Sequence, residues 1–393
     1  MKTALVRIAA VSLLTLVGAG AASVAFETPV IAKDPPSKGP VPMFQVDAYW
    51  PKPLPNRWLV GSVIGVSVDA MDHVWIIHRP STLKGNEIRA KWQSAPPILE
   101  FDQEGNLLSS WGGKGEGYEW ATSEHTVYVD HKDNIWTAGG GAKDAQILKF
   151  NRQGKFLMQI GHQGKSRGSN DTENLGGAAG LTVDPETNEL YVGDGYRNHR
   201  VIVFDADTGA YKRHWGAYGN KPDDNFFKSA SDKGGIEAED ASAYNPKDPP
   251  SPQFRVVHSV RISNDGLVYV CDRTNDRIQV FRKDGTFVKE AFIEKNTLGS
   301  GSAWDMVFSK DPAQKFIFLT DGTNEVVWEL LRDSLEVVAG FGGAGHWAGQ
   351  FYGPHNIAID SKGNLYITET YEGKRVQKFV YKGLGAGVLP SFN

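Results

Sequence analysis

Three histidines, His125, His258 and His355, stand at one position of a repeated sequence pattern. Each lies five residues before the polar residue that ends a short apolar segment. Imidazole nitrogens are common zinc ligands, and three of them with one open coordination position form a typical catalytic zinc site. Iron, cobalt and copper accept imidazole ligands as well. The pattern therefore predicts a metal site, with Zn²⁺ as the first choice.

The pattern occurs six times along the chain, and the histidines occupy every second copy. If the copies form a ring, side chains from the second, fourth and sixth copies converge on the axis at one height. The alternative is that each histidine caps its own copy and hydrogen-bonds to its neighbours. The strict alternation favours the metal site. In chain order, the residues at this register are Ile64, His125, Ala179, His258, Trp304 and His355.

The copies consist of short strands joined by tight turns, which predicts an all-β protein. The first five copies read as four strands each and the sixth as three. The composition agrees, since 11 Trp, 13 Tyr and 19 Phe favour strands and 44 Gly favour turns. Six such units predict a six-bladed β-propeller, with a β-sandwich or an open array as the alternative. The innermost strands are expected at residues 64–69, 125–130, 180–184, 258–263, 303–309 and 355–360.

A spare segment near the N-terminus, Phe44–Trp50, alternates like a strand. Because the sixth copy lacks an outer strand, we expect this segment to complete the sixth blade and close the ring. Cys271 is the only cysteine, so strand pairing rather than an internal disulfide must provide the closure. The propeller is expected over residues 44–385, followed by a C-terminal tail at residues 386–393.

The first 25 residues have the pattern of a signal peptide. Lys2 and Arg7 precede an apolar run, and small residues at positions 23 and 25 suit cleavage after Ala25. An uncleaved membrane anchor is the alternative. Residues 26–43 are rich in Pro and Lys and are expected to form an extended tether. These features predict an exported protein, periplasmic or secreted, that has no membrane span after cleavage.

The charge of the chain bears on its partners. The formal net charge is −4, without a basic run that would attract nucleic acid. We therefore expect a monomer that takes a small-molecule or peptide substrate.

Two further residues are expected on the face where the innermost strands begin. The second strands return to that face, where Arg79 stands in copy one and Tyr196 in copy three. Arg79 is a cation suited to a carboxylate or a developing oxyanion, or to a structural salt bridge. Tyr196 suits proton transfer if a nearby cation or metal lowers its pKa, or stacking at the rim. The long connections 161–177 and 218–253 lead to the same face.

Short motifs around these residues resemble those of one known family. The motifs are Gly65-Val-Ser-Val-Asp69, Ile77-His-Arg79, His125-Thr-Val127, Asp194-Gly-Tyr196-Arg-Asn198, Val257-His258-Ser-Val260 and Gly353-Pro-His355-Asn356. They resemble the NHL-repeat lyase half of peptide-amidating enzymes, peptidyl-α-hydroxyglycine α-amidating lyase. The similarity spans roughly residues 60–379, the whole of the expected propeller.

The resemblance implies a function and a set of roles. It implies a catalytic zinc on His125, His258 and His355, with Arg79 and Tyr196 as the essential arginine and tyrosine. The implied reaction splits an α-hydroxyglycine amide, or a related α-hydroxy amide, into an amide and glyoxylate. Zinc would polarise the hydroxyl, Tyr196 would accept its proton, and Arg79 would hold the carboxylate.

The resemblance also implies a structural calcium, with one departure from the family pattern. Where the family has Asp after the last histidine, this chain has Asn356. The backbone carbonyls expected to contribute are those of Val66 and Val127. Because Ca²⁺ prefers charged oxygen ligands, we expect the loss of one carboxylate to weaken calcium binding.

Two other classes of function stay open on the sequence alone. One is a metal-dependent hydrolase, such as a lactonase, on the same scaffold, although such sites usually hold calcium with Glu, Asn and Asp. The other is a non-catalytic NHL propeller that binds a peptide or a glycan. Absence of metal from an intact purified protein would favour the latter.

Overall fold

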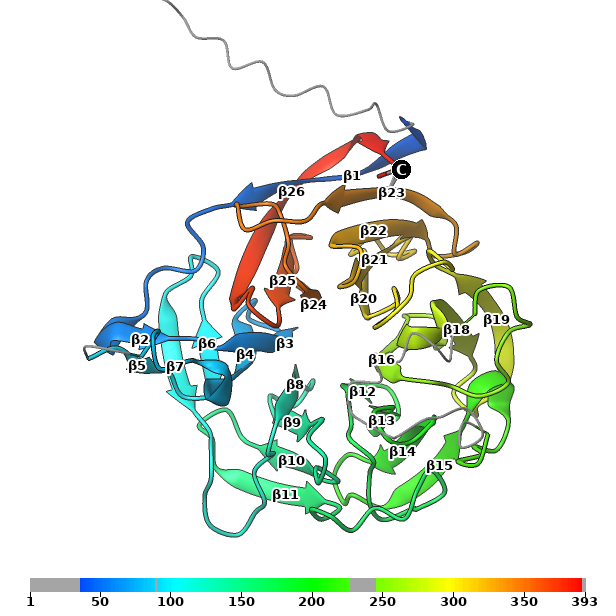
Figure 1. Ribbon diagram of the computed structural model, residues 1–393, viewed down its shortest axis with the longest axis horizontal. Coiled ribbons are helices and arrows are strands. Elements are labelled where there is room, and N and C mark those ends of the chain that lie inside the picture. The colour runs from blue at the N-terminus through cyan, green and yellow to red at the C-terminus, as the bar shows by residue number, and fades with distance from the viewer. Residues whose placement is uncertain (1–35, 89–90, 227–244, 391–393) are drawn as a thin grey trace, which may run out of the picture. The chain divides into compact units, whose positions relative to one another are not determined.

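The computed structural model describes residues 36–88, 91–226 and 245–390, which form a ring of six β-sheets around a central axis (Figure 1). Each of the six sheets has four antiparallel strands. The prediction of an all-β, six-bladed propeller is confirmed. The expected signal peptide and residues 26–35 of the expected tether lie outside the described residues, as do residues 227–244 of the second long connection.

The innermost strand of each blade lines the central channel, and the other strands follow outward (Figure 1). Blade one consists of β3 (Ser62–Val68), β4 (Val74–Arg79), β6 (Ile98–Phe101) and β7 (Leu107–Trp111). Blade two consists of β8 (Glu124–Val129), β9 (Ile135–Gly139), β10 (Ile147–Phe150) and β11 (Phe156–Ile160). Blade three consists of β12 (Gly180–Asp184), β13 (Glu189–Asp194), β14 (Arg200–Asp205) and β15 (Tyr211–Trp215).

The second half of the ring repeats this arrangement. Blade four consists of β16 (Val257–Ile262), β17 (Val268–Asp272), β18 (Arg277–Phe281) and β19 (Phe287–Phe292). Blade five consists of β20 (Asp305–Phe308), β21 (Phe316–Asp321), β22 (Val326–Leu331) and β23 (Val337–Gly342). Blade six consists of β24 (Pro354–Ile359), β25 (Leu365–Glu369), β26 (Arg375–Val388) and β1 (Pro36–Asp47). The innermost strands begin and end within two residues of the predicted positions.

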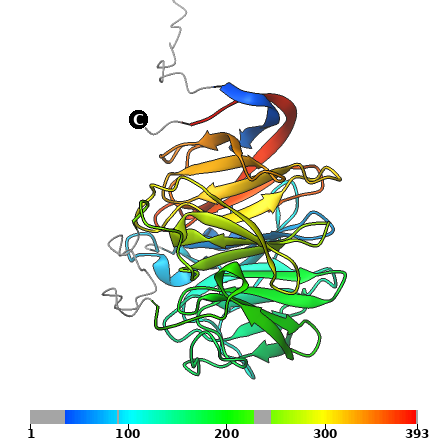
Figure 2. The same ribbon diagram turned by 90° about the vertical axis from the view of Figure 1, so that its right-hand side faces the viewer.

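The N-terminal strand closes the ring, as predicted, but it is longer than predicted. β1 pairs antiparallel with β26 from Pro36 opposite Val388 to Asp47 opposite Lys378, and Figure 2 shows the two strands side by side. Residues 36–43 are thus strand rather than tether, and residues 386–388 are strand rather than tail. Proline is compatible with an edge strand because one side of that strand needs no hydrogen-bond donor. The register shifts next to Pro40 and Pro42.

A carboxylate at the end of the innermost strand fixes the register of several blades. Asp69 Oδ2 accepts a hydrogen bond from Trp75 Nε1 at 3.0 Å, and Asp130 Oδ2 accepts one from Trp136 Nε1 at 2.8 Å. Both tryptophans are fully buried. Since each bond joins the end of the first strand to a residue of the second, a slip of one residue would break it. The hydrogen bond therefore also fixes the position of the residue five places earlier in the same strand, which is Ile64 in blade one and His125 in blade two.

Apolar cores lie between neighbouring blades. In one buried cluster, Tyr269 and Ile278 of blade four pack against Met306, Leu319 and Trp328 of blade five. Burial of one large apolar side chain stabilises the fold by about 1.5 to 3 kcal/mol. Packing of this kind between all neighbours gives the channel a rigid wall.

Some short elements were not predicted from the sequence. β2 (Trp58–Leu59) and β5 (Gln93–Ser94) pair in parallel at the outer side of blade one (Figure 1). Single 3₁₀ turns occupy η1 (Pro55–Arg57), η2 (Pro80–Thr82), η3 (Ala217–Gly219) and η5 (Arg273–Asn275). In the described part of the chain, no helix is long and apolar enough to cross a membrane.

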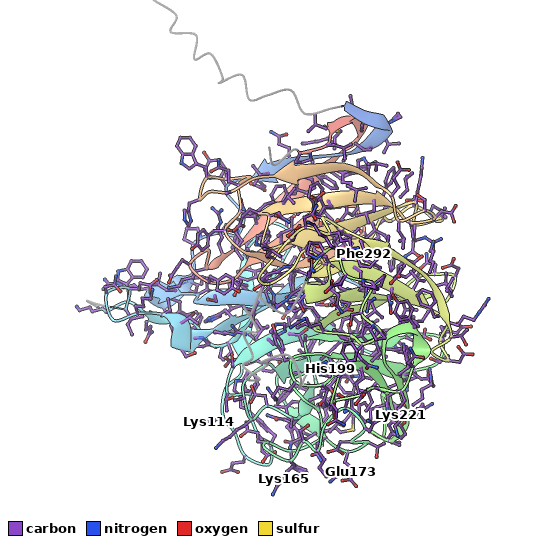
Figure 3. The ribbon with its side chains drawn as sticks, turned by 45° about the vertical axis from the view of Figure 1, so that its right-hand side comes forward. Lys114, Lys165, Glu173, His199, Lys221 and Phe292 are labelled. Carbon is purple, nitrogen blue, oxygen red and sulfur yellow. The ribbon has the colours of Figure 1, made fainter. Side chains whose placement is uncertain are left out.

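Charged side chains of both signs project from the rim of blades two and three. Figure 3 shows Lys114, Lys165, Glu173 and Lys221 pointing outward from this rim, and all four are exposed. The absence of a nucleic-acid partner, the monomeric state and the export of the protein stay predictions.

Candidate metal centre and active site

The structure brings the three histidines together in the channel. His125, His258 and His355 are each the second residue of an innermost strand, β8, β16 and β24. One ring nitrogen of each lies within 4.8 Å of the corresponding nitrogens of the other two. Their exposed fractions are 0%, 0% and 3%. The alternating register of the repeat is therefore realised as three converging imidazoles.

Two of these imidazoles are oriented by the carbonyl of the next blade. His125 Nδ1 lies 3.0 Å from the carbonyl oxygen of Ala179, and His258 Nδ1 lies 2.8 Å from that of Trp304. A carbonyl only accepts, so each Nδ1 carries the proton and each Nε2 keeps its lone pair. An imidazole held in this way presents Nε2 to a metal.

The third imidazole has the same arrangement with one addition. The imidazole of His355 hydrogen-bonds to the backbone of Ile64. Its Nδ1 also lies 2.5 Å from Asn356 Oδ1. Ala179, Trp304 and Ile64 occupy the histidine register in the copies that lack histidine. Each histidine blade is therefore followed by a blade that supplies its carbonyl acceptor.

Burial keeps the three imidazoles neutral. It lowers the pKa of His355 to about 3, and the nearby cations Arg79 and Arg273 lower it further. Burial also lowers the pKa values of His125 and His258 well below the ordinary value, with smaller contributions from the neighbouring histidines and arginines. Neutral imidazole is the form that binds a metal. The residues present thus fit a three-histidine zinc centre.

Tyr196 lies beside the three histidines. Its hydroxyl is 2.5 Å from His125 Nε2 and 3.3 Å from His258 Nε2. The ring packs closely over Gly140, where an added Cβ would lie 3.0 Å from Tyr196 Cε2. Burial raises the pKa of Tyr196 above its ordinary value, and the charges of Arg273 and Arg79 offset only part of that rise. The predicted proton-transfer residue is therefore at the predicted metal centre.

Arg79 ends β4 and faces the same group. Its Nε donates to the carbonyl oxygen of Glu124 at 2.8 Å, which fixes the side chain next to His125. Burial raises the pKa of the neighbouring Glu124 carboxyl, and the charge of Arg79 opposes that rise. The guanidinium acts electrostatically on His125, His355 and Tyr196.

Sequence reasoning missed a second arginine, Arg273, at the start of η5. Its guanidinium carbon lies 4.7 Å from the ring centroid of Trp304 and 5.7 Å from that of Tyr196. The side chain is buried, and its Nε has no partner among the described residues. The sequence contains a pattern that could have identified Arg273. Arg79 and Arg273 each stand 15 residues after the histidine register of their own copy.

Buried Arg–Asp pairs hold both long connections against the blades. Arg200 Nε donates to Asp194 Oδ2 at 2.9 Å, and its Nη2 donates to the carbonyl oxygen of Asn174 at 3.0 Å. Arg277 Nε likewise donates to Asp272 Oδ2 at 2.8 Å. Asp194 and Asp272 are thus structural carboxylates. They fix the loops from which Tyr196 and Arg273 extend.

The residues expected to bind calcium lie deeper in the channel. Asn356 Oδ1 contacts His355, and its Nδ2 donates to Asp305 Oδ2 at 2.8 Å. Val66 and Val127 lie on β3 and β8, each two residues after the histidine register.

A second group of potential ligands, Asp69, His73 and Glu100, lies near the end of β3. Arg152 Nη2 lies 2.7 Å from Asp69 Oδ2 and also pairs with Glu100. The guanidinium already supplies the positive charge there, so this group is an ion-pair network.

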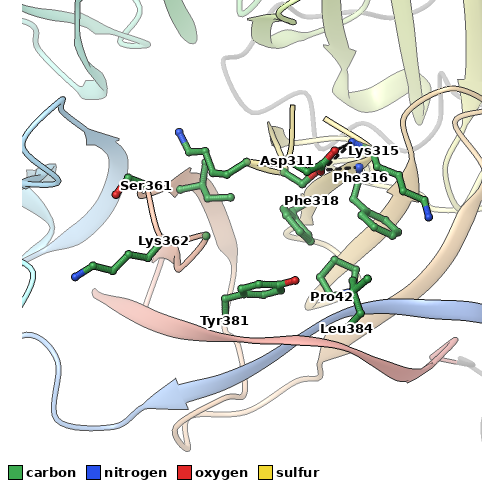
Figure 4. Close-up of a pocket in the computed structure, with 13 residues that line it drawn as sticks. Pro42, Asp311, Lys315, Phe316, Phe318, Ser361, Lys362, Tyr381 and Leu384 are labelled. Carbon is green, nitrogen blue, oxygen red and sulfur yellow. Dashed lines mark hydrogen bonds between the residues drawn. The ribbon is translucent and has the colours of Figure 1, made fainter. Parts of the chain in front are cut away.

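A separate cavity of about 370 Å³ lies beneath β1 and β26, at the ends of β20 and β24 opposite to the histidines. Figure 4 shows its lining, in which the rings of Phe316, Phe318 and Tyr381 lie near charged residues such as Asp311 and Lys362. None of the predicted site residues lines it.

Comparison with known proteins identifies a repeat family and several distant relatives. Residues 175–204, 254–281 and 351–379 match the NHL repeat. The chain is 26% identical to human NHL repeat-containing protein 3 over 353 residues, covering 86% of this chain and 84% of that protein. It is 24% identical over 364 residues to peptidyl-alpha-hydroxyglycine alpha-amidating lyase 1 of Drosophila melanogaster, covering 85% of this chain and 59% of that protein.

A streptogramin B lyase structure has the same fold. It superposes with a TM-score of 0.51 at 13% identity and covers 86% of this chain and 98% of that chain. The protein is therefore a six-bladed propeller that contains NHL repeats and is distantly similar to an amidating lyase. The predicted NHL repeats and the predicted resemblance are confirmed.

Proposed function

We propose that this protein is a zinc-dependent lyase that cleaves the N–C bond of an α-hydroxyglycine-type amide, or of a related α-hydroxy amide. The observation that carries the proposal is the convergence of three neutral imidazoles, one tyrosine hydroxyl and two arginines at one end of the channel. Distant similarity to an amidating lyase supports the same reaction class.

The arginines suit the charge of such a substrate. An α-hydroxyglycine amide carries a carboxylate next to the carbon that bears the hydroxyl. Arg79 and Arg273 bring two guanidinium groups to the histidines, and a guanidinium binds a carboxylate through paired, charge-assisted hydrogen bonds. In the proposed complex, the reacting carbon would lie between the arginines and the Nε2 atoms.

The remaining groups suit elimination. His125, His258 and His355 would hold Zn²⁺ through their Nε2 atoms, and the ion would supply Lewis acidity toward the substrate hydroxyl. Tyr196 accepts the hydroxyl proton as a phenolate; burial raises the pKa of its hydroxyl, and the charges of Arg273 and Arg79 oppose that rise. The electrons of the O–H bond form the new carbonyl and those of the C–N bond pass to nitrogen, which takes the proton back from Tyr196. The products are an amide and glyoxylate.

The experiment pairs elemental analysis of the purified protein with a glyoxylate-release assay on α-hydroxyhippurate, with and without chelator. We expect about one zinc per chain and chelator-sensitive release. His258→Ala should lose the zinc and the activity while circular dichroism stays β-rich. His131→Ala is the matched control, since His131 is exposed in a turn of blade two. Full zinc in His258→Ala would refute the three-histidine centre.

The competing proposal is a non-catalytic propeller that binds a peptide or a glycan. The chain is also similar to NHL repeat-containing protein 3 over most of both chains, and that name states no reaction. Bound zinc without glyoxylate release would support the proposed metal centre and exclude this substrate. Absence of any transition metal from the folded protein would favour the binding propeller.

A further inference from the structure

A guanidinium group occupies the channel directly beneath the three histidines. Arg261 extends from β16 across the channel, and its side chain is 16% exposed. Its Nε donates to the carbonyl oxygen of Met306 at 2.9 Å in blade five. Its Nη1 lies 3.3 Å from the carbonyl oxygen of Leu181 in blade three. One side chain of blade four therefore connects both neighbouring blades across the channel.

These carbonyls belong to the ring of positions where the resemblance implies calcium. Leu181 and Met306 stand two residues after the histidine register, as Val66 and Val127 do. Arg261 and Val66 also line one cavity of about 220 Å³. The guanidinium thus lies in the layer of the channel that was expected to hold the ion.

The one carboxylate in contact with Asn356 is already saturated with hydrogen bonds. Asp305 Oδ2 accepts from Arg261 Nη2 at 2.8 Å, Asn356 Nδ2 at 2.8 Å and the backbone N–H of Ile357 at 3.2 Å. Asp305 Oδ1 accepts a hydrogen bond from Ser259 Oγ at 2.5 Å and another from the backbone N–H of Met306 at 2.8 Å. Ca²⁺ requires six to eight oxygen ligands, so this layer does not fit the ion.

The charges lead to the same conclusion. Arg261 and Asp305 form a neutral pair, and Asp305 is fully buried. A divalent cation placed beside the guanidinium would meet a like charge at short range without a second carboxylate to offset it.

We propose that Arg261 takes the place of a structural calcium, so that the channel is held together by an internal cation. The same network orients a candidate metal ligand. Arg261 holds Asp305, Asp305 holds the amide of Asn356, and Asn356 Oδ1 accepts from His355 Nδ1 at 2.5 Å. Arg261 is therefore a positioning residue for His355, through two hydrogen-bonded intermediates.

The first test uses the unmodified protein and does not depend on the proposed reaction. The protein is equilibrated with millimolar CaCl₂ or with EGTA, and its calcium content and Tm are measured. We expect no bound calcium and a Tm that differs by less than about 1 °C, because a ligand specific to the folded state raises Tm by several degrees at saturation. One tightly bound calcium per chain, or a clear rise in Tm, would overturn the proposal.

The second test compares Arg261→Met with Arg332→Met by titration with Zn²⁺ against a competing chelator. Arg332 is a matched control, since it is 18% exposed, pairs with Asp265 at 2.9 Å and donates to a backbone carbonyl, far from the histidines. Both variants should lower Tm. Only Arg261→Met should weaken zinc binding, by about tenfold or more, the usual effect of losing a group that orients a ligand. Unchanged zinc affinity in folded Arg261→Met would refute the positioning role.

Discussion

Glu329 gives the most direct test of the energetics of this fold. It lies in β22 opposite Phe318 and Ala339, and only 3% of it is exposed. Its Oε2 has no hydrogen-bond partner among the described residues. Burial raises the pKa of Glu329 to about 8, and no charged neighbour contributes. The folded protein therefore holds this carboxyl in its neutral form at neutral pH.

The sign of the pH dependence follows from this shift. In the unfolded chain the pKa returns to about 4.5. Between these values the folded state binds a proton that the unfolded chain releases, so stability falls as pH rises, by about 1.4 kcal/mol per pH unit. The full interval corresponds to about 4 to 5 kcal/mol. Relaxation and water entry on ionisation reduce this, and we expect about 2 to 4 kcal/mol in practice.

The perturbation is Glu329→Gln, which keeps the shape and removes the titration. Urea unfolding of both proteins from pH 5 to pH 8.5 should give nearly equal stability at pH 5. At pH 8.5 the variant should be more stable by about 2 to 4 kcal/mol. Asp321 and Glu325, whose pKa values burial raises to about 7, are present in both proteins, so their effects cancel in the difference. A difference that does not change with pH would refute the reasoning.

Three further outcomes test the site and the closure of the ring. Arg273→Met should lower kcat/KM by about 10- to 100-fold on a substrate with a free carboxylate, and much less on the corresponding carboxamide. An equal loss on both would exclude a carboxylate contact. Gly140→Ala places a Cβ 3.0 Å from Tyr196 and should reduce turnover about tenfold with zinc retained. The control is Gly85→Ala, because an added Cβ at Gly85 meets open space. An equal loss of turnover in both variants would refute the role of the Gly140 contact in positioning Tyr196. A chain that starts at residue 44 instead of 36 loses the buried Val41 and should unfold about 1 to 3 kcal/mol more easily, whereas a tether would make no difference.

The sequence carried the fold and the centre of the site because both depend on repetition. The spacing between the register residue and the strand-end carboxylate recurs, so the positions of His125, His258 and His355 followed from counting. That spacing is enforced by contacts within one blade, such as Asp69 to Trp75. Contacts within one repeat are visible in a single sequence.

Other parts of the site depend on contacts between repeats, which the sequence does not display. Arg261 resembles an ordinary residue of an innermost strand until its neighbours in blades three and five are placed beside it. Arg273 likewise becomes recognisable only when Trp304 of blade five is placed beside it. The start of β1 was predicted wrongly for another reason. Its prolines predict a tether, and only the pairing with β26 shows that they belong to a strand.

The alternation of histidine and carbonyl blades has a consequence for how such a ring can change. Each imidazole depends on the carbonyl of the blade that follows it, and each of those blades is followed by another imidazole. The working unit is therefore a pair of blades, and the ring contains three pairs. Insertion or loss of a single blade would interrupt the alternation and move the three imidazoles away from equal spacing around the axis. A ring that gains or loses a whole pair of blades keeps the order of imidazole and carbonyl blades.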